Sequence, residues 1–346
     1  MDHRRSARPK IARQGIAVLA IASAGLLAAC SSSSSSSSTR TPASGGSKNV
    51  TIAFNMGSEA DPFFVAMNTG AEAEAKALSV TLDWQGNPSV YSPATQIPIV
   101  TEMLAERPSA LIIAPTDPNA LQPAVNSAIA QGMPVVNVDT HVSDLSKVLA
   151  FITGNNMQGG EVAADAMAKA MHYKAGQTYQ VAVGMSSPTS TTDVERLAGF
   201  KAEIAAKYPS IQLVAVAYSQ SVAATANANV SDWLTKYPNL KGIFAIDGTN
   251  ASGASAALQA RGLVGKIALV GYDAYSTDVA LLQKGVFAAL IAQQPGLEGQ
   301  MAVADVVKYL RTKSVAGIPH LVTLPNIVLT PTTPASVLAK YTYPTA

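Results

Sequence analysis

The sequence has a single cysteine, Cys30, in its 346 residues, which excludes a disulfide framework within one chain. Charged residues are also scarce, because Asp, Glu, Lys and Arg make up 13% of the chain, against about 25% in an average soluble protein. Apolar residues make up 48% and favour a large packed core. Gly and Pro interrupt the internal apolar stretches, so none has the ~20 residues needed to cross a bilayer.

Motifs of the common enzyme and nucleotide-binding classes are missing as well. The sequence contains no Gly-x-Gly-x-x-Gly, no Gly-x-x-x-x-Gly-Lys and no Gly-x-Ser-x-Gly. The histidines after Cys30 are His141, His172 and His320, and they lack the spacing of metal ligands. We therefore expect no metal site, no cofactor and no enzymatic activity.

The formal net charge of +2 originates at the N-terminus. Five of the 24 basic residues and one of the 22 acidic residues precede Cys30, which leaves 19 and 21 after it, a charge of −2. A nucleic-acid-binding protein would carry a basic stripe, and this sequence has none. Nucleic acid is therefore excluded as a partner.

The first thirty residues have the layout of an export signal. A basic segment precedes an apolar run over residues 16–29, and that run ends in Leu27-Ala28-Ala29-Cys30. This ending resembles the lipobox of bacterial lipoproteins, which implies a signal peptide over residues 1–29 and a lipid on Cys30. The alternative is a transmembrane anchor, but the run has fourteen residues where about 20 are needed.

Eight consecutive serines follow Cys30. Such a segment has no apolar side chains to bury, so residues 30–47 are predicted to form a flexible tether. A lipid on Cys30 would hold the exported chain at the extracytoplasmic face of the cell membrane.

From residue 48 onward, short β-branched runs alternate with helical patterns of 7–16 residues. Strands are predicted at residues 50–54, 80–84, 110–114, 134–138, 148–152, 181–184, 212–217, 242–246, 266–270 and 287–291. Helices are predicted at residues 63–78, 94–106, 120–131, 160–172, 192–207, 223–236, 251–261 and 278–284. Strands that alternate with helices indicate parallel sheets of right-handed βαβ units. The two series predict an α/β protein of two doubly wound lobes.

Acidic residues follow several of these strands directly. Asp139, Asp247 and Asp273 each come immediately after an apolar run, and Asp61 follows the first strand. Ligands of open α/β sheets bind beyond the carboxyl ends of the strands. An aspartate at this position can also cap the next helix. Four such acids after four different strands favour a shared polar cleft over four separate caps.

The segment 59–64 (EADPFF) resembles the Asn-Pro-Phe-Phe segment after the first strand of ribose-type periplasmic binding proteins. Further similar motifs follow in the same order: 114–117 (APTD), 134–139 (PVVNVD), 159–160 (GG), 195–200 (ERLAGF), 243–247 (IFAID), 270–273 (VGYD) and 292–293 (AQ). The resemblance covers residues from about 50 to 328. It implies the type I periplasmic binding protein fold, in which two lobes are joined by three hinge crossings.

The resemblance places the crossings near residues 153–154, 293–294 and 321–322. The first lobe would then comprise residues 48–153 and 294–321, and the second lobe residues 154–293 and 322–346. It also implies the ligand contacts Asp61, Phe63, Phe64, Asp139, Thr140, Arg196, Asp247, Asp273 and Gln293. An aromatic contact from the second lobe has no matching motif, and Tyr218 is considered by proximity only. Carboxylates and a guanidinium suit sugar hydroxyls, and phenyl faces suit the CH surface of the carbon skeleton.

The sequence departs from the ribose pattern at three of these positions. Asp61 and Asp247 replace asparagines, and Thr140 replaces an arginine. Four acids beside one arginine would repel an anion and suit a ligand rich in hydroxyl donors, such as a pentose or a short alditol like xylitol or threitol.

The implied function is the capture of this neutral sugar or sugar alcohol and its delivery to the permease and ATPase of an ABC transporter, by a binding protein expected to be a monomer. A sensor that presents its closed form to a membrane receptor remains open. A cleft enzyme on the same fold is the less favoured alternative. A repressor is excluded, because an export signal occupies the position of its DNA-binding helices.

Overall fold

The computed structural model describes residues 50–344. The predicted signal peptide, the lipidation site Cys30 and the serine-rich tether lie outside the described residues. Among the helices that are described, none combines the length and the apolar character that a membrane span requires.

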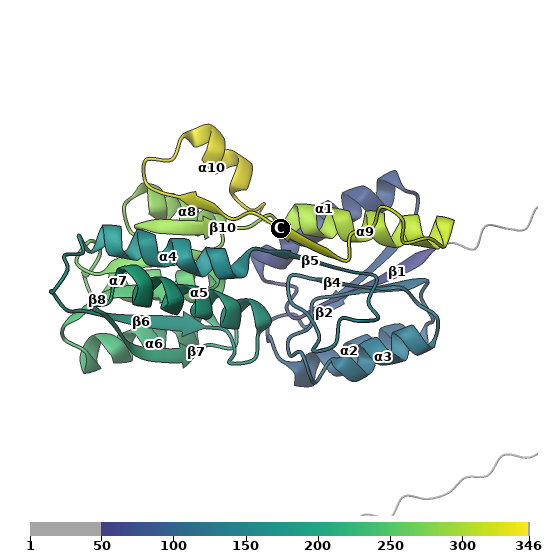
Figure 1. Ribbon diagram of the computed structural model, residues 1–346, viewed down its shortest axis with the longest axis horizontal. Coiled ribbons are helices and arrows are strands. Elements are labelled where there is room, and N and C mark those ends of the chain that lie inside the picture. Colours follow the sequence, from purple (N-terminus) through teal and green to yellow (C-terminus); the bar gives the residue numbers. More distant parts are fainter. Residues whose placement is uncertain (1–49, 345–346) are drawn as a thin grey trace, which may run out of the picture. The chain divides into compact units, whose positions relative to one another are not determined.

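Strands and helices alternate along the described part of the chain (Figure 1). The strands are β1 (Thr51–Met56), β2 (Thr81–Gly86), β3 (Ala110–Ile113), β4 (Val135–Val138), β5 (Ala150–Gly154), β6 (Tyr179–Met185), β7 (Ile211–Tyr218), β8 (Leu240–Ala245), β9 (Ala268–Tyr272), β10 (Ala289–Ala292), β11 (Leu321–Leu324) and β12 (Ile327–Leu329). The helices are α1 (Pro62–Ala77), α2 (Pro93–Ala105), α3 (Gln122–Ala130), α4 (Asn156–Ala170), α5 (Thr191–Lys207), α6 (Ala223–Lys236), α7 (Gly248–Ala260), α8 (Ser276–Gln283), α9 (Pro295–Thr312) and α10 (Ala335–Tyr341).

The strands form two six-stranded sheets. The first has the order β11-β5-β4-β3-β1-β2, and all of its pairs are parallel. The second has the order β12-β10-β9-β8-β6-β7, and it is parallel except for β12, which pairs with β10 in the antiparallel direction. The prediction of two doubly wound α/β lobes is confirmed, with one antiparallel edge strand in addition.

The second sheet repeats the strand order of the first. In this repeat β1 corresponds to β6, β3 to β8, β4 to β9 and β5 to β10. Strand order reverses beside β1 in one sheet and beside β6 in the other. Ligands of such sheets bind at these reversal points, beyond the carboxyl ends of the strands.

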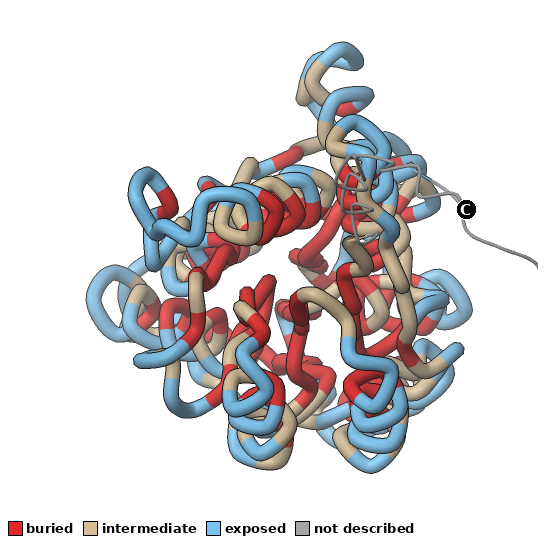
Figure 2. Tube along the Cα trace, turned by 90° about the vertical axis from the view of Figure 1, so that its right-hand side faces the viewer, coloured by how far each residue is buried: buried red, intermediate tan, exposed pale blue. Residues whose placement is uncertain are grey.

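The core lies between the sheets and the helices that cover them. All four residues of β3 and all four of β4 are buried, as expected for central parallel strands with helices on both faces. In Figure 2 the buried segments lie inside and the exposed ones at the periphery.

Three segments connect the sheets. The chain passes from β5 to α4, which packs on α5 and β9, and from β10 to α9, which packs on α1, β4 and β5. The third passage links β11 to β12 at Pro325-Asn326. The sequence-based crossing at residues 321–322 therefore falls too early, because residues 321–324 still pair with β5 in the first sheet.

We call the first sheet with α1, α2, α3 and α9 the first lobe, and the second sheet with α4 to α8 and α10 the second lobe. Glycines allow close contact between the helices at the crossings. A side chain on Gly160 would collide with the backbone oxygen of Arg196, and one on Gly199 with that of Met157. The contact of α4 with α5 therefore depends on both glycines and fixes the backbone that carries Arg196.

Candidate functional site

A polar cavity lies between the two lobes at the carboxyl ends of their strands. It is lined by Asp61, Phe63, Phe64, Tyr91, Asp139, Ser186, Ser190, Thr192, Asp193, Arg196, Ser221, Asp247, Asp273 and Gln293. The centres of water molecules have about 40 Å³ to move in.

The structure brings together eight of the nine residues that the resemblance implied. The exception is Thr140, which is fully buried but does not line the cavity. Its hydroxyl has no hydrogen-bond partner among the described residues. The role of Thr140 as a ligand contact therefore stays a prediction.

Asp61 is placed by the first turn of α1. It is the N-cap of this helix, and its Oδ1 accepts a hydrogen bond from the backbone amide of Phe63 at 2.9 Å. Pro62 occupies the first helical position, where no amide hydrogen is needed. Phe63 and Phe64 are thereby held at the cavity wall with their rings edge to face, 5.3 Å apart.

Asp139 and Asp273 follow β4 and β9, which are equivalent strands of the repeat. Both have a left-handed backbone, with φ of 58° and 69°. The carboxylate of Asp273 accepts hydrogen bonds from the Gly248 amide at 2.9 Å, from Gln293 Nε2 at 2.7 Å and from the Tyr343 hydroxyl at 3.0 Å. The carboxylate of Asp139 accepts none from the described residues.

Asp247 and Asp193 belong to the starts of α7 and α5. Asp247 caps α7 and accepts hydrogen bonds from the amide and the side chain of Asn250, at 2.8 and 2.6 Å. Asp193 accepts hydrogen bonds from the amide and the hydroxyl of Ser186, at 2.7 and 2.6 Å. Both acids thus serve as helix-start residues and as part of the cavity wall.

Arg196 is the one Lys or Arg in the cavity lining. Its Nε donates to Asn156 Oδ1 at 2.9 Å, its Nη1 to the backbone oxygen of Ile246 at 3.2 Å and its Nη2 to Gln293 Oε1 at 2.9 Å. The guanidinium lies 3.9 Å above the ring of Tyr272, in a cation–π contact. Asn156 and Gln293 follow β5 and β10 at the first two crossings, so Arg196 is held by two of the three connections between the lobes.

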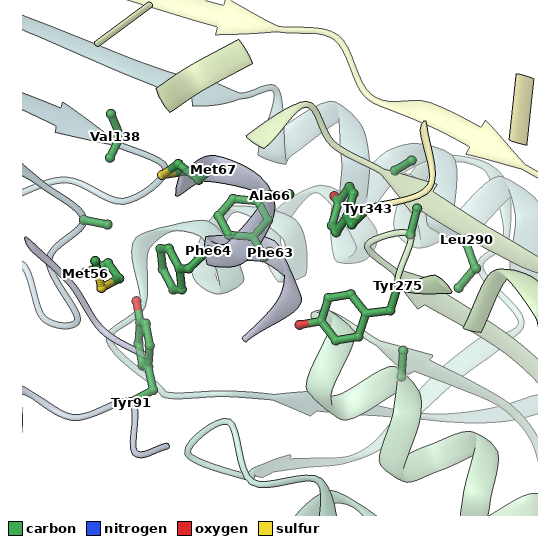
Figure 3. Close-up of a cluster of buried hydrophobic side chains, with 14 of the residues drawn as sticks. Met56, Phe63, Phe64, Ala66, Met67, Tyr91, Val138, Tyr275, Leu290 and Tyr343 are labelled. Atoms are coloured by element: carbon green, nitrogen blue, oxygen red, sulfur yellow. The ribbon is translucent and has the colours of Figure 1, made fainter. Parts of the chain in front are cut away.

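The cavity aromatic rings, Phe63, Phe64 and Tyr91, all belong to the first lobe. Figure 3 shows them with Tyr275 and Tyr343, which come from the second lobe and lie beside the cavity rather than in its lining. Tyr218 is 45% exposed and is not among the residues that line the cavity.

The two lobes contact each other at two places near the cavity. At one place the hydroxyl of Tyr275 donates to Asp61 Oδ1. At the other place the backbone amide of His141 donates to the Thr191 hydroxyl at 3.3 Å, and His141 Nε2 lies 4.0 Å from a Glu195 oxygen. We call this state, in which the lobes contact each other beside the cavity, the enclosed form.

Burial dominates the electrostatics of the site. It raises the pKa of Asp61 to about 6, with Tyr275 opposing the shift, and that of Asp139 to about 7, with the charge of Arg196 opposing it. Burial likewise raises the pKa of Asp193, Asp247 and Asp273. For Arg196, burial favours a lower pKa, but Tyr272, Asp273 and the other acids raise it, so the guanidinium stays charged.

The sequence reasoning missed several residues of the site. Asp193 had a usable signal, because it lies three residues before Arg196 and therefore on the same helix face. Tyr91, Tyr275 and Tyr343 had none, since loops and the C-terminal segment bring them to the site through contacts distant in sequence.

Comparison with known proteins identifies the family. Residues 52–314 match the periplasmic binding protein domain. The ribose import binding protein of Bacillus subtilis (strain 168) is 29% identical over 306 residues, 88% of this chain and 95% of that protein. The D-ribose/D-allose-binding protein of Pseudomonas aeruginosa is 30% identical over 266 residues, 75% of this chain and 82% of that protein.

Solved structures agree with this assignment. An ABC transporter solute-binding protein from Agrobacterium vitis, bound with α-D-tagatopyranose, has a TM-score of 0.79 and 29% identity, covering 86% of this chain and 100% of that chain. The chain belongs to the periplasmic binding protein family.

Proposed function

We propose that this periplasmic binding protein captures a neutral small sugar or sugar alcohol, a pentose or a short alditol such as xylitol or threitol, and delivers it to the permease of an ABC transporter. The observation that carries the proposal is the cavity between the lobes, where five aspartates surround one arginine beside three aromatic rings. Relatives named for ribose, allose and apiose support the sugar class.

The balance of charge favours a neutral ligand. Five carboxyl groups against one guanidinium would repel a sugar phosphate or a sugar acid. An ionised carboxylate accepts hydrogen bonds and donates none. The cavity therefore suits a molecule that offers many hydroxyl donors. Hydrogen bonds to charged groups are also the stronger ones, at about 1.5–3 kcal/mol each.

The distribution of the aromatic rings favours an alditol over a pyranose. All three cavity rings lie on the first lobe, while the second lobe contributes carboxyls, hydroxyls, an amide and the guanidinium. A pyranose has two apolar CH faces, and rings on both lobes would cover both of them. An open-chain alditol can turn its carbon chain toward one wall and its hydroxyls toward the other.

The size of the cavity supports a single small ligand. The space that water centres can occupy in the cavity is about 40 Å³, well below the ~300–1,000 Å³ of pockets for drug-sized ligands. A cavity of this size favours one small ligand over a disaccharide.

The lobes and their crossings would supply the motion that transport needs. We propose that the first two crossings and Pro325-Asn326 act as hinges, and that the enclosed form is the one presented to the permease. A sensor function, in which the enclosed form is presented to a membrane receptor, uses the same site and remains the second candidate.

The proposed location is the extracytoplasmic face of the cell membrane, with a lipid on Cys30. This rests on the sequence Leu27-Ala28-Ala29-Cys30 at the end of an apolar run. Cys30→Ser should release the protein or leave its signal uncleaved. Unchanged membrane association with normal processing would contradict lipidation.

Thermal-shift measurements test the ligand class directly, because a ligand that binds the native state raises its melting temperature. The panel would contain xylitol, D-threitol, D-ribose, D-allose and ribose 5-phosphate, followed by calorimetry on each hit. The expected result is a large shift for a neutral polyol or sugar and none for the phosphate. Tight binding of the phosphate alone, or conversion of a ligand during the titration, would overturn the proposal.

A further inference from the structure

Asp193 is a cavity residue that the motifs shared with the ribose-type proteins do not include. It lies in the first turn of α5, and its side chain is almost fully buried while lining the cavity. Arg196 follows three residues later on the same helix, so the two side chains share one helix face.

The two carboxylate oxygens of Asp193 have different surroundings. Oδ2 accepts hydrogen bonds from the amide and the hydroxyl of Ser186, and from the Ser187 amide at 3.4 Å. Oδ1 lies 4.0 Å from Arg196 Nη1, beyond hydrogen-bond length. Within residues 50–344 Oδ1 accepts no hydrogen bond, although each carboxylate oxygen can accept about two.

Asp139 offers a comparable group from the opposite lobe. Its carboxylate also lines the cavity and accepts no hydrogen bond from the part of the chain that the structure describes. Arg196 interacts with the charge of both acids. The cavity therefore has free acceptor oxygens on both lobes, next to the single guanidinium.

We propose that Asp193 is a specificity-determining residue whose Oδ1 accepts a hydrogen bond from a ligand hydroxyl, while Asp139 accepts one from a second hydroxyl. This rests on the proposed function and deepens it. The ligand is then a polyol or sugar that directs at least two donor hydroxyls to this end of the cavity, one toward each lobe. In the alternative, Asp193 has a purely structural role. It would accept the hydrogen bonds of Ser186 and offset the charge of Arg196 without contacting the ligand.

The variant Asp193→Asn tests the proposal, since it keeps the side-chain shape and removes the charge. The probe is whichever of xylitol, D-threitol and D-ribose binds the wild-type protein most tightly in calorimetry. We expect a tenfold to hundredfold loss of affinity, which corresponds to about 1.4–2.8 kcal/mol. The matched control is Asp232→Asn, which makes the same change at an exposed position of α6 and should bind like the wild type.

Monodeoxy analogues of the probe separate binding from a structural role. The analogue that lacks the hydroxyl bound by Asp193 should bind the wild-type protein more weakly than the parent probe does. The Asp193→Asn variant should bind this analogue and the parent probe equally well, because the removed hydroxyl and the removed charge are partners. A structural role predicts instead that every analogue loses the same factor in both proteins. That uniform loss, or full affinity in Asp193→Asn, would overturn the proposal.

A crystal structure of the wild-type protein with the probe gives a second measurement that does not need a folded variant. A ligand oxygen at about 2.5–3.0 Å from Asp193 Oδ1 is expected. An Oδ1 that contacts only protein or water would contradict the proposal. Failure of the proposed function looks different, because no member of the polyol and sugar panel would then bind the wild-type protein.

Discussion

Asp139 and Asp273 occupy equivalent positions in the two sheets, with the same backbone and different side-chain partners. Both have positive φ, and their amides donate to Ile152 and Ile291, each at 2.8 Å. The Asp273 carboxylate accepts hydrogen bonds from three donors of the protein. The Asp139 carboxylate accepts none from the described residues. Asp273 is therefore preorganised, whereas the Asp139 carboxylate is available to a ligand.

This difference leads to the first prediction, which compares Asp139→Asn with Asp273→Asn. Asparagine tolerates a left-handed backbone, so both variants keep their local conformation. Asp139→Asn should lower affinity about tenfold or more and leave the melting temperature at or above that of the wild type, because a buried acid is removed. Asp273→Asn should lower both, because its three donors no longer meet two acceptor oxygens.

Calorimetry and thermal unfolding of the two variants check this prediction. Asp139 is assigned to ligand binding, and Asp273 to both binding and stability. This assignment would be wrong if Asp139→Asn bound the ligand normally, or if the melting temperature fell by the same amount in both variants.

The second prediction concerns Arg196, which fixes the centre of the site. Arg196→Ala would leave Asn156 and Gln293 without their donor and the neighbouring acids without a counter-charge. We expect about a hundredfold loss of affinity, or ~2.8 kcal/mol, and a loss of stability on the order of 3–5 kcal/mol. Arg261→Ala is the control, because Arg261 is an exposed arginine of the same lobe. Calorimetry on the folded fraction would refute this role if affinity were unchanged.

The sequence predicted most of the fold because buried parallel strands have a strong local pattern. Each of β1 to β10 overlaps a predicted strand. The short strands β11 and β12 were missed, since they lie at sheet edges and depend on partners far away in sequence. Helix α9 was also missed, although Pro295 stands at its start, because residues 293–294 were considered only as a crossing.

The site was predictable where residues follow strands or resemble known motifs. Asp139, Asp247 and Asp273 come within two residues of the ends of strands and Asp61 lies between β1 and α1, and the structure gathers all four in one cavity. Tyr343 could not have been predicted in this way, because α10 and the segment after it contact the site only through tertiary packing. Thr140 was included by transfer of a position from the family motif, and the structure does not place it in the cavity lining.

The third prediction concerns pH. Burial raises the pKa of Asp61 to about 6 and of Asp139 to about 7, above the ordinary value of 3.8. Between these pH values the native form therefore binds more protons than the unfolded chain. The contribution of Asp61 and Asp139 to the free energy of unfolding is complete below about pH 4 and is lost as pH rises to about 7. Ligand hydroxyls donate to ionised carboxylates and lower these pKa values, so binding should release protons between about pH 5 and 7.

Calorimetry in two buffers of different ionisation enthalpy measures the protons released. The release should be smaller in Asp139→Asn than in the wild type, with Asp232→Asn as the control. The assignment of the released protons to Asp139 would be contradicted if the wild-type protein took up protons on binding, or if the wild type and Asp139→Asn released equal numbers.

The fourth prediction concerns the contact of Tyr275 with Asp61, which joins the lobes. Tyr275→Phe removes the donor and keeps the ring, so the enclosed form should be less populated without ligand. Small-angle scattering should show a larger radius of gyration for the ligand-free variant and equal radii for the ligand-bound proteins. Tyr218→Phe is the control, because this exposed tyrosine lies away from the cavity. Equal ligand-free radii in variant and wild type would exclude a closing role for the contact.

The last prediction concerns Tyr343, through which the C-terminal segment reaches the site. Its hydroxyl donates to Asp273 Oδ1 at 3.0 Å and accepts from the Gln293 amide at 3.1 Å. Its own amide donates to Ala274 at 2.8 Å. Tyr343→Phe keeps the ring beside Phe63 and leaves the buried amide of Gln293 without an acceptor, at a cost of about 1–3 kcal/mol.

We therefore expect Tyr343→Phe to lower the melting temperature by several degrees, taking about 2–4 °C per kcal/mol. Affinity should also fall, by about tenfold, because Asp273 loses one of the three donors that orient it. Tyr341→Phe is the matched control, since Tyr341 lies two residues earlier and its hydroxyl has no hydrogen-bond partner among the described residues. If Tyr343→Phe melted lower but bound with full affinity, Tyr343 would stabilise the lobe without positioning Asp273, because a misplaced carboxylate must weaken the contacts of the ligand.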